Sequence, residues 1–312
     1  MLAHCPSSLP LSSAVWIDLL EPTEEERAQV EQALELRMPA RSELEEIESS
    51  SRAFIEKASL YLSTPVLEGS DCRNDVLTTV GFVLSKKSLV TLRFAHVAAF
   101  AAVQRSAEQE KLSASDILLR LLEGIVDHTA DALEHASADL ETISRATFHA
   151  EHPRRRQLKK AGEDLNAGLR KLGKLADRAS RLRDTLLGVG RIASFALEAD
   201  EGRRFGSGST SLEVVRRDVG SLSDYHAHLS GKIQFLLDAT LGFINIQQND
   251  IVKALTIVSV VGVPPVLIVG IYGMNFKHMP ELDWALGYPF ALILLVLSAL
   301  LPLGWFKWRG WM

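Results

Sequence analysis

The sequence lacks the features that are typical of secreted proteins, of nucleotide-driven proteins and of proteins with metal clusters. Its two cysteines, Cys5 and Cys72, lack metal-site spacing, so we interpret them as free thiols in a reducing compartment. Residues 1–10 lack the basic start and long apolar core of a secretory signal, so the N-terminal body is expected to stay in the cytoplasm. The sequence contains no GxxxxGK[ST] phosphate loop, and no nucleophile and base stand at useful spacing. We therefore expect no enzyme.

Long apolar segments lie near the C-terminus. Residues 251–271 carry one charge, Lys253, and residues 289–306 carry none. At about 1.5 Å per residue, each segment can cross a hydrocarbon layer roughly 30 Å thick. With a net charge of −5 and 47% hydrophobic residues, the chain fits a large soluble body with a small membrane part.

The connecting segment and the flanking charges predict the orientation of these two spans. Residues 272–288 are polar and rich in Pro and Gly, which indicates a loop on the far side of the membrane. Two basic residues, Lys307 and Arg309, follow the second span, whereas in the loop the positive charge of Lys277 is offset by acidic residues. Both termini are therefore expected in the cytoplasm, with the spans in the cell (inner) membrane.

The N-terminal third mixes strand and helix signals. Residues 14–19, 59–67, 76–84 and 88–94 are short runs rich in Val, Leu, Phe, Tyr and Thr, which favour strands. Thr23 and Glu26 form a capping-box pattern that predicts a helix to about Leu36, and residues 41–49 favour another helix. We predict an α+β domain with a mixed sheet.

Helical periodicity dominates from Ser113 onward. Leucines and isoleucines at steps of three and four predict a helix to about Phe148 and a second from about Arg154 to Ala199. A third begins near Ser211 and meets no proline before Pro264, so stalk and first span form one helix, on the order of 90 Å long. So long a helix needs neighbours, which copies around a symmetry axis would supply.

These signals divide the chain into seven parts. They are a cytoplasmic α/β domain (1–106), long antiparallel cytoplasmic helices (107–210), a stalk helix (211–250), a first transmembrane helix (251–271), an extracytoplasmic loop (272–288), a second transmembrane helix (289–306) and a cytoplasmic basic tail (307–312).

One face of the first span combines small and mildly polar residues. Packing between helices explains such a face, but helices ringed about an axis would instead point it into a water-filled lumen. The candidate pore-lining residues are Asn249, Val252, Leu255, Thr256, Ser259, Val263, Val266 and Gly270.

The residues around and between the spans resemble the CorA family of divalent-cation channels. The resemblance lies in Gly273-Met274-Asn275 after a Pro-containing span, in Pro264-Pro265, and in the closing Lys307-Trp308-Arg309. It implies a funnel-shaped homopentamer whose first spans line the pore. It also implies Mg²⁺ as the substrate, with Co²⁺ or Ni²⁺ as further cargo. In the family, intracellular Mg²⁺ holds the pore shut, but the sequence does not identify the acidic residues of this regulatory site.

The resemblance gives the loop residues specific roles. Asn275 would hydrogen-bond the waters of a hydrated ion, and Gly273 would permit the tight turn that aims these side chains at the axis. Asn249 would form a second polar ring, and Glu281 and Asp283 would concentrate cations at the mouth. Lys277 and His278 depart from the acidic residues often found there.

Two alternatives remain open. Some relatives carry zinc, so a zinc or broad divalent transporter of the same family is the nearest one. A membrane-anchored scaffold or sensor is the alternative of another class, although a tether needs no aligned polar face.

A basic cluster begins the second long helix. It is explained by a solvated helix start, by contact with anionic membrane lipid or, least well, by nucleic acid, which we do not expect as a partner. The cluster comprises Arg154, Arg155, Arg156, Lys159 and Lys160.

Overall fold

The computed structural model describes residues 1–6, 10–46, 48, 52–69, 76–148, 158–199, 208–274, 280 and 284–311. The chain divides into two compact units, each described by itself below. The first comprises Met1–Ala150 and Ala167–Leu237, and the second Glu151–Asn166 and Asp238–Met312.

A six-stranded mixed sheet organises the first unit. Its spatial order is β1-β2-β6-β5-β4-β3, and only β2 and β6 pair in parallel. The predicted mixed sheet is therefore confirmed. The strands are β1 (Leu2–Cys5), β2 (Trp16–Leu20), β3 (Ala53–Glu56), β4 (Ser59–Leu67), β5 (Leu77–Leu84) and β6 (Leu89–Arg93).

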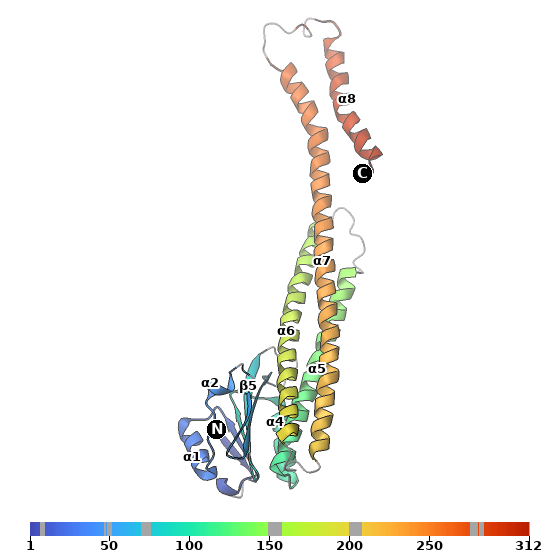
Figure 1. The fold of residues 1–312 in the computed structure, drawn as a ribbon. Helices are drawn as coiled ribbons and strands as arrows, with labels where there is room; N and C mark the ends of the chain where they lie inside the picture. The colour runs from blue at the N-terminus through green and yellow to red at the C-terminus, as the bar shows by residue number, and fades with distance from the viewer. Residues whose placement is uncertain are drawn as a thin grey trace. The chain divides into compact units, whose positions relative to one another are not determined.

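Helices cover both faces of this sheet (Figure 1). Alternate strand residues enter two hydrophobic cores, because successive side chains point to opposite faces. The smaller core, with Ile17 and Val83, packs against Val30 of α1 (Glu24–Leu34) and Leu44 of α2 (Arg41–Leu44). The larger core joins the other face to α4 (Ala98–Gln109), α5 (Ala114–Phe148), α6 (Leu158–Glu198) and α7 (Gly208–Tyr272).

The start of α1 forms as its sequence predicts. Glu26 N–H donates to Thr23 Oγ1 at 3.2 Å, and Thr23 N–H donates to Glu26 Oε2 at 3.1 Å. Burial of Val30 then fixes the helix against the sheet. The capping box and the helix are confirmed.

Several elements differ from the sequence-based expectation. Strands β1 and β3 were not predicted, because each is a four-residue edge strand with too short a pattern to detect. Helix α4 was not predicted either. Helix α2 ends at Leu44 instead of near Ser49, because Leu44 is its one buried side chain and Glu45 and Glu46, which follow it, are exposed.

Three long helices form the rest of this unit's core (Figure 1). Their fully buried leucines include Leu118 of α5, Leu182 of α6 and Leu212 of α7. Near the end of α5, Lys232 Nζ of α7 lies 3.3 Å from Glu141 Oε2, and the rings of Phe148 and Phe235 stack with centroids 6.0 Å apart. The predicted long helices are confirmed, and among the described residues no strand follows β6.

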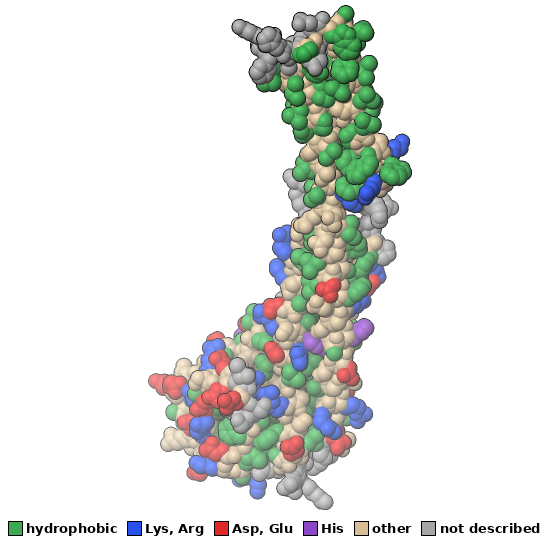
Figure 2. All heavy atoms as spheres, turned by 45° about the horizontal axis from the view of Figure 1, so that its top comes forward, with side chains coloured by type: hydrophobic (Ala, Val, Ile, Leu, Met, Phe, Trp, Pro, Cys, Tyr) green, Lys and Arg blue, Asp and Glu red, His purple; other side chains and the backbone are tan. Residues whose placement is uncertain are grey.

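The second unit contains the C-terminal part of α7 and α8 (Gly287–Trp308). Both helices are long and apolar enough to cross a membrane, with mean hydropathies of 2.4 and 2.2 over 18-residue windows. Their exposed side chains form a largely hydrophobic surface (Figure 2). Since α7 is continuous from Gly208 to Tyr272, the prediction that stalk and span are one helix is confirmed.

Candidate functional site

The candidate pore residues share an uncovered face of α7. Apart from the adjacent Leu255 and Thr256, they follow one another at steps of three or four from Asn249 to Gly270, which places them on one side of the helix. All are exposed except Thr256, which is half-buried and donates from Oγ1 to the Val252 carbonyl at 2.8 Å. The apolar members are among the most exposed, with Leu255 at 67% and Val266 at 70%. We call this side of α7 the open face.

The opposite side of α7 is partly covered. The half-buried side chains on this side also recur at helical spacing. They are Ile257, Val261, Pro264, Pro265, Ile268 and Tyr272. The covered residues of α8 likewise recur at helical steps and include Ala291, Leu295, Ser298, Pro302 and Phe306. Both stripes belong to one compact unit in which α8 runs beside the end of α7 (Figure 1). The covered side of α7 is thus the side away from the open face.

Polar groups mark the start of the open face. Asn249 is exposed there, and the neighbouring Asp250 Oδ1 lies 3.6 Å from Lys253 Nζ. The charge of the lysine inside the predicted span is therefore balanced within one helical turn. Beyond this pair, the open face carries hydroxyl groups at Thr256 and Ser259 and otherwise apolar or small residues.

Two consecutive prolines interrupt the hydrogen bonding of α7 farther along. Pro264 and Pro265 have no N–H group, so the carbonyls of Val260 and Val261 lose their usual helical donors. The helix nevertheless continues to Tyr272. Hydrophobic surroundings make such free carbonyls costly unless another group satisfies them.

Gly273 sits at the end of α7 in a crowded backbone position. Its N–H donates to the Val269 carbonyl at 2.9 Å, and Met274 N–H donates to the Ile271 carbonyl at 3.2 Å. A Cβ at Gly273 would lie 3.1 Å from the Val269 oxygen. Gly273 is not among the positive-φ residues, so lack of space, not a left-handed conformation, favours glycine here.

Several predicted site residues lie outside the described part of the chain. In the loop these are Asn275, Lys277, His278, Glu281 and Asp283, while Gly273 and Met274 are described and exposed. In the basic cluster, Arg154, Arg155 and Arg156 fall outside it, and Lys159 and Lys160 have described backbone only, in the first turn of α6. Cys72 is not described, and Cys5 is a buried free thiol.

The described side chains offer no site for a dehydrated metal ion. Among them, no group of three or more His, Cys, Asp and Glu residues is arranged to hold one. The two histidines of α7 lie on different sides of the helix, as their spacing predicts. His226 is 8% exposed inside the helical bundle, whereas His228 is exposed. Burial lowers the pKa of His226, although a hydrogen bond with the backbone of Ala179 opposes this effect.

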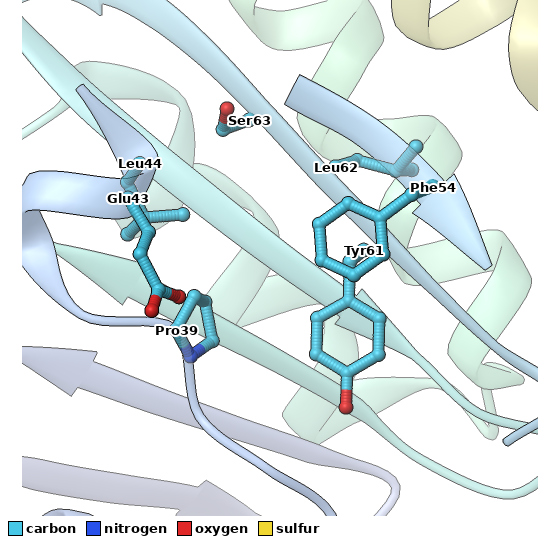
Figure 3. Close-up of a pocket in the computed structure, with 7 residues that line it drawn as sticks. All are labelled: Pro39, Glu43, Leu44, Phe54, Tyr61, Leu62 and Ser63. Carbon is cyan, nitrogen blue, oxygen red and sulfur yellow. The ribbon is translucent and has the colours of Figure 1, made fainter. Parts of the chain in front are cut away.

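A shallow pocket lies between α2 and the edge of the sheet (Figure 3). Two aromatic side chains line it, Phe54 and Tyr61, and their rings stack with centroids 4.9 Å apart. Burial raises the pKa of Tyr61. The Oγ of Ser63 is buried there without a partner among the described residues. Its cavity volume of about 20 Å³ is far below the usual size of a small-molecule site, so we assign it no ligand.

Comparison with known proteins covers nearly the whole chain. Residues 12–308 match the family described as "CorA-like Mg2+ transporter protein". The magnesium transport protein CorA of Haemophilus ducreyi is 36% identical over 97% of this chain and 93% of its own length. The protein of the same name from Escherichia coli K12 is 34% identical over 98% and 94%.

A solved structure shares the fold. The complete structure of the CorA magnesium transporter from Methanocaldococcus jannaschii aligns with a TM-score of 0.72 at 19% identity. The alignment covers 95% of this chain and 91% of the other. The α/β domain, the long helices and the two C-terminal helices therefore form a known architecture.

Proposed function

This chain belongs to the CorA-like Mg²⁺ transporter family, and we propose that it conducts hydrated Mg²⁺ into the cytoplasm through a homopentameric pore in the cell (inner) membrane. The observation that carries this proposal is the open face of α7. An isolated span has no use for Asn249, Thr256 and Ser259 on a face that its own partner helix leaves uncovered. Five copies around an axis would turn these faces toward a shared lumen.

The loop supplies the selectivity in this proposal. Mg²⁺ loses its waters reluctantly and prefers six oxygen neighbours, so a neutral ring that accepts hydrogen bonds from those waters can bind the ion and still release it. Asn275 carboxamide oxygens provide such acceptors, and Gly273 and Met274 connect them to the end of α7. Glu281 and Asp283, repeated in each copy, attract cations to the mouth without selecting among them.

The apolar part of the open face is the proposed gate. Val252, Leu255 and Val263 would narrow the lumen with side chains that water wets poorly, so a small inward movement would empty it of water. Asn249 forms the polar ring on the cytoplasmic side. Intracellular Mg²⁺ is proposed to favour this closed state, which gives negative feedback on uptake.

The membrane potential suffices as the driving force. A divalent cation gains about 4.6 kcal/mol per 100 mV on moving inward, from roughly 2.3 kcal/mol for each charge. Co²⁺ and Ni²⁺ are proposed as further cargo. A zinc preference is the alternative suggested by Lys277 and His278, which replace acids at the mouth.

Replacement of Asn275 by alanine tests the selectivity role. In a host that needs a magnesium transporter for growth, we expect Asn275→Ala to lose rescue while the protein still forms pentamers. Asn166→Ala, the same change at an exposed asparagine of α6 outside the loop, serves as the matched control and should retain rescue. Full rescue by Asn275→Ala would refute the proposed selectivity mechanism.

A further inference from the structure

The end of α8 carries a compact set of aromatic and basic side chains. We call Trp305, Lys307, Trp308, Arg309 and Trp311 the C-terminal aromatic-basic cluster. Three tryptophans and two cations thus occupy seven consecutive positions.

A helix-ending motif holds this cluster in place. Gly310 has φ of 71°, its N–H donates to the Lys307 carbonyl at 3.2 Å, and Trp311 N–H donates to the Phe306 carbonyl at 3.0 Å. These bonds form a Schellman motif, in which glycine takes the left-handed position at low cost. The last residues therefore turn back on the helix.

Ring contacts reinforce this turn. Trp311 stacks on Phe306 with centroids 5.4 Å apart, and Phe306 is only 2% exposed. The Arg309 guanidinium carbon lies 5.2 Å from the centroid of the Trp305 ring, within the range of a cation–π interaction. The indole thus orients the cation beside it.

The remaining surfaces of the cluster have no partner in the described chain. Trp308 is 83% exposed, and Trp305 and Trp311 are exposed over nearly half their area. Neither Lys307 nor Arg309 forms an ion pair with any described residue, and residues 284–311 contain no Asp or Glu. Two cations, of which Arg309 is oriented by Trp305, and the exposed parts of three indoles are left for an external group.

The position of the cluster indicates the chemistry of that group. It lies where the apolar α8 ends, and Figure 2 shows Lys and Arg side chains at one end of the hydrophobic surface of this unit. Tryptophan prefers the boundary between hydrocarbon and headgroups because its ring is apolar and its N–H is polar. Lysine and arginine near this boundary attract anionic lipid.

We propose that the C-terminal aromatic-basic cluster binds the headgroup of an anionic phospholipid. Lys307 and Arg309 contact the phosphate, and Trp305 and Trp308 lie at the level of the glycerol backbone. The proposal rests on α8 crossing the membrane, and it is independent of which ion the protein carries.

Tryptophan quenching by brominated lipids tests this proposal. The full-length protein with Trp284→Phe is reconstituted in vesicles that contain brominated phosphatidylglycerol or, in parallel, brominated phosphatidylcholine at the same mole fraction. The remaining signal comes from the cluster and from Trp16, which is 2% exposed within the sheet core. We expect stronger quenching by brominated phosphatidylglycerol, with an enrichment of about fivefold for each basic residue, from about 1 kcal/mol per cation.

Charge variants provide the controls. Lys307→Gln with Arg309→Gln should equalise quenching by the two lipids, whereas the charge-preserving pair Lys307→Arg with Arg309→Lys should keep the preference. Neutralising Lys86 and Lys87, two exposed lysines between β5 and β6, should leave it unchanged. Equal quenching of the starting protein by both lipids, or a preference that survives Lys307→Gln with Arg309→Gln, would overturn the proposal.

Discussion

At the scale of single residues, the first unit depends on a buried ion pair. Arg93 Nη2 lies 2.7 Å from Asp18 Oδ2, and Thr91 Oγ1 donates to Asp18 Oδ1 at 2.8 Å. Trp16 Nε1 in turn donates to Thr91 Oγ1 at 3.0 Å. This network joins β2 to β6, the one parallel pair of the sheet.

Breaking this pair should strongly destabilise the protein. In Asp18→Ala, the Arg93 charge stays buried without its partner, which costs about 3–5 kcal/mol. Thermal unfolding of the purified full chain measures the loss. Glu45→Ala removes the partner of Arg41 in an exposed pair and should cost less than about 1 kcal/mol. Similar losses in the two variants would contradict the structural role of Asp18.

His226 should make stability depend on pH. Its Nε2 lies 3.3 Å from Ser230 Oγ, and Arg183 and Asp184 of α6 are the charged groups that act on it. Because burial lowers its pKa in the folded state, the unfolded chain binds more protons. Stability is therefore full above the unfolded pKa of roughly 6.5 and falls as pH decreases through the folded pKa.

Melting temperatures between pH 5 and 8 check this dependence. We expect a decrease below about pH 6.5 in the unmodified protein, since that is the ordinary histidine pKa. The slope should flatten in His226→Gln and persist in the exposed His228→Gln. An unchanged slope in His226→Gln would assign the pH dependence to other groups.

At the scale of elements, sequence patterns predicted what depends on local signals. The α1 cap, the long apolar stripes of α5 and α6 and the unbroken course of α7 are of this kind. The edge strands β1 and β3 gain their conformation from neighbours far along the chain, as in the pairing of Leu2 with Leu19. Such contacts leave little trace in a four-residue segment.

The candidate site was predictable to the same limited extent. Helical spacing placed Asn249 to Gly270 on one side of α7. It could not show that α8 would cover Val261 and Ile268 on the other side, because this depends on how two apolar helices pack. The C-terminal aromatic-basic cluster entered the sequence analysis as a charge signal and as part of the family resemblance, but the Gly310 and Trp311 pattern of a helix end was not used.

Cysteine accessibility distinguishes the two sides of α7. In a background with Cys5 and Cys72 replaced by serine, a charged thiol reagent should reach Val263→Cys on the open face and block transport. It should not reach Val261→Cys, because that half-buried position lies on the side of α7 away from the open face. Ion flux before and after the reagent is the measurement. Block at Val261→Cys but not at Val263→Cys would assign the pathway to the other face.

At the scale of the whole molecule, the proposed pore requires several copies of the chain. Phe235 of the first unit, and Leu241 and Ile246 farther along α7, are exposed apolar side chains that one described chain leaves uncovered. Symmetric assembly would bury these side chains and bring the open faces of α7 together around an axis.

Metal uptake by purified protein in sealed vesicles tests the central claim most directly. With a Mg²⁺-sensitive dye inside, the reconstituted protein should admit Mg²⁺, and an inside-negative potential should increase the rate because it drives the divalent cation inward. Parallel dyes for Co²⁺ and Zn²⁺ give the preference, and Asn275→Ala provides the inactive control. Mg²⁺ entry no faster than in protein-free vesicles would contradict the account and leave a membrane-anchored scaffold or sensor as the better explanation.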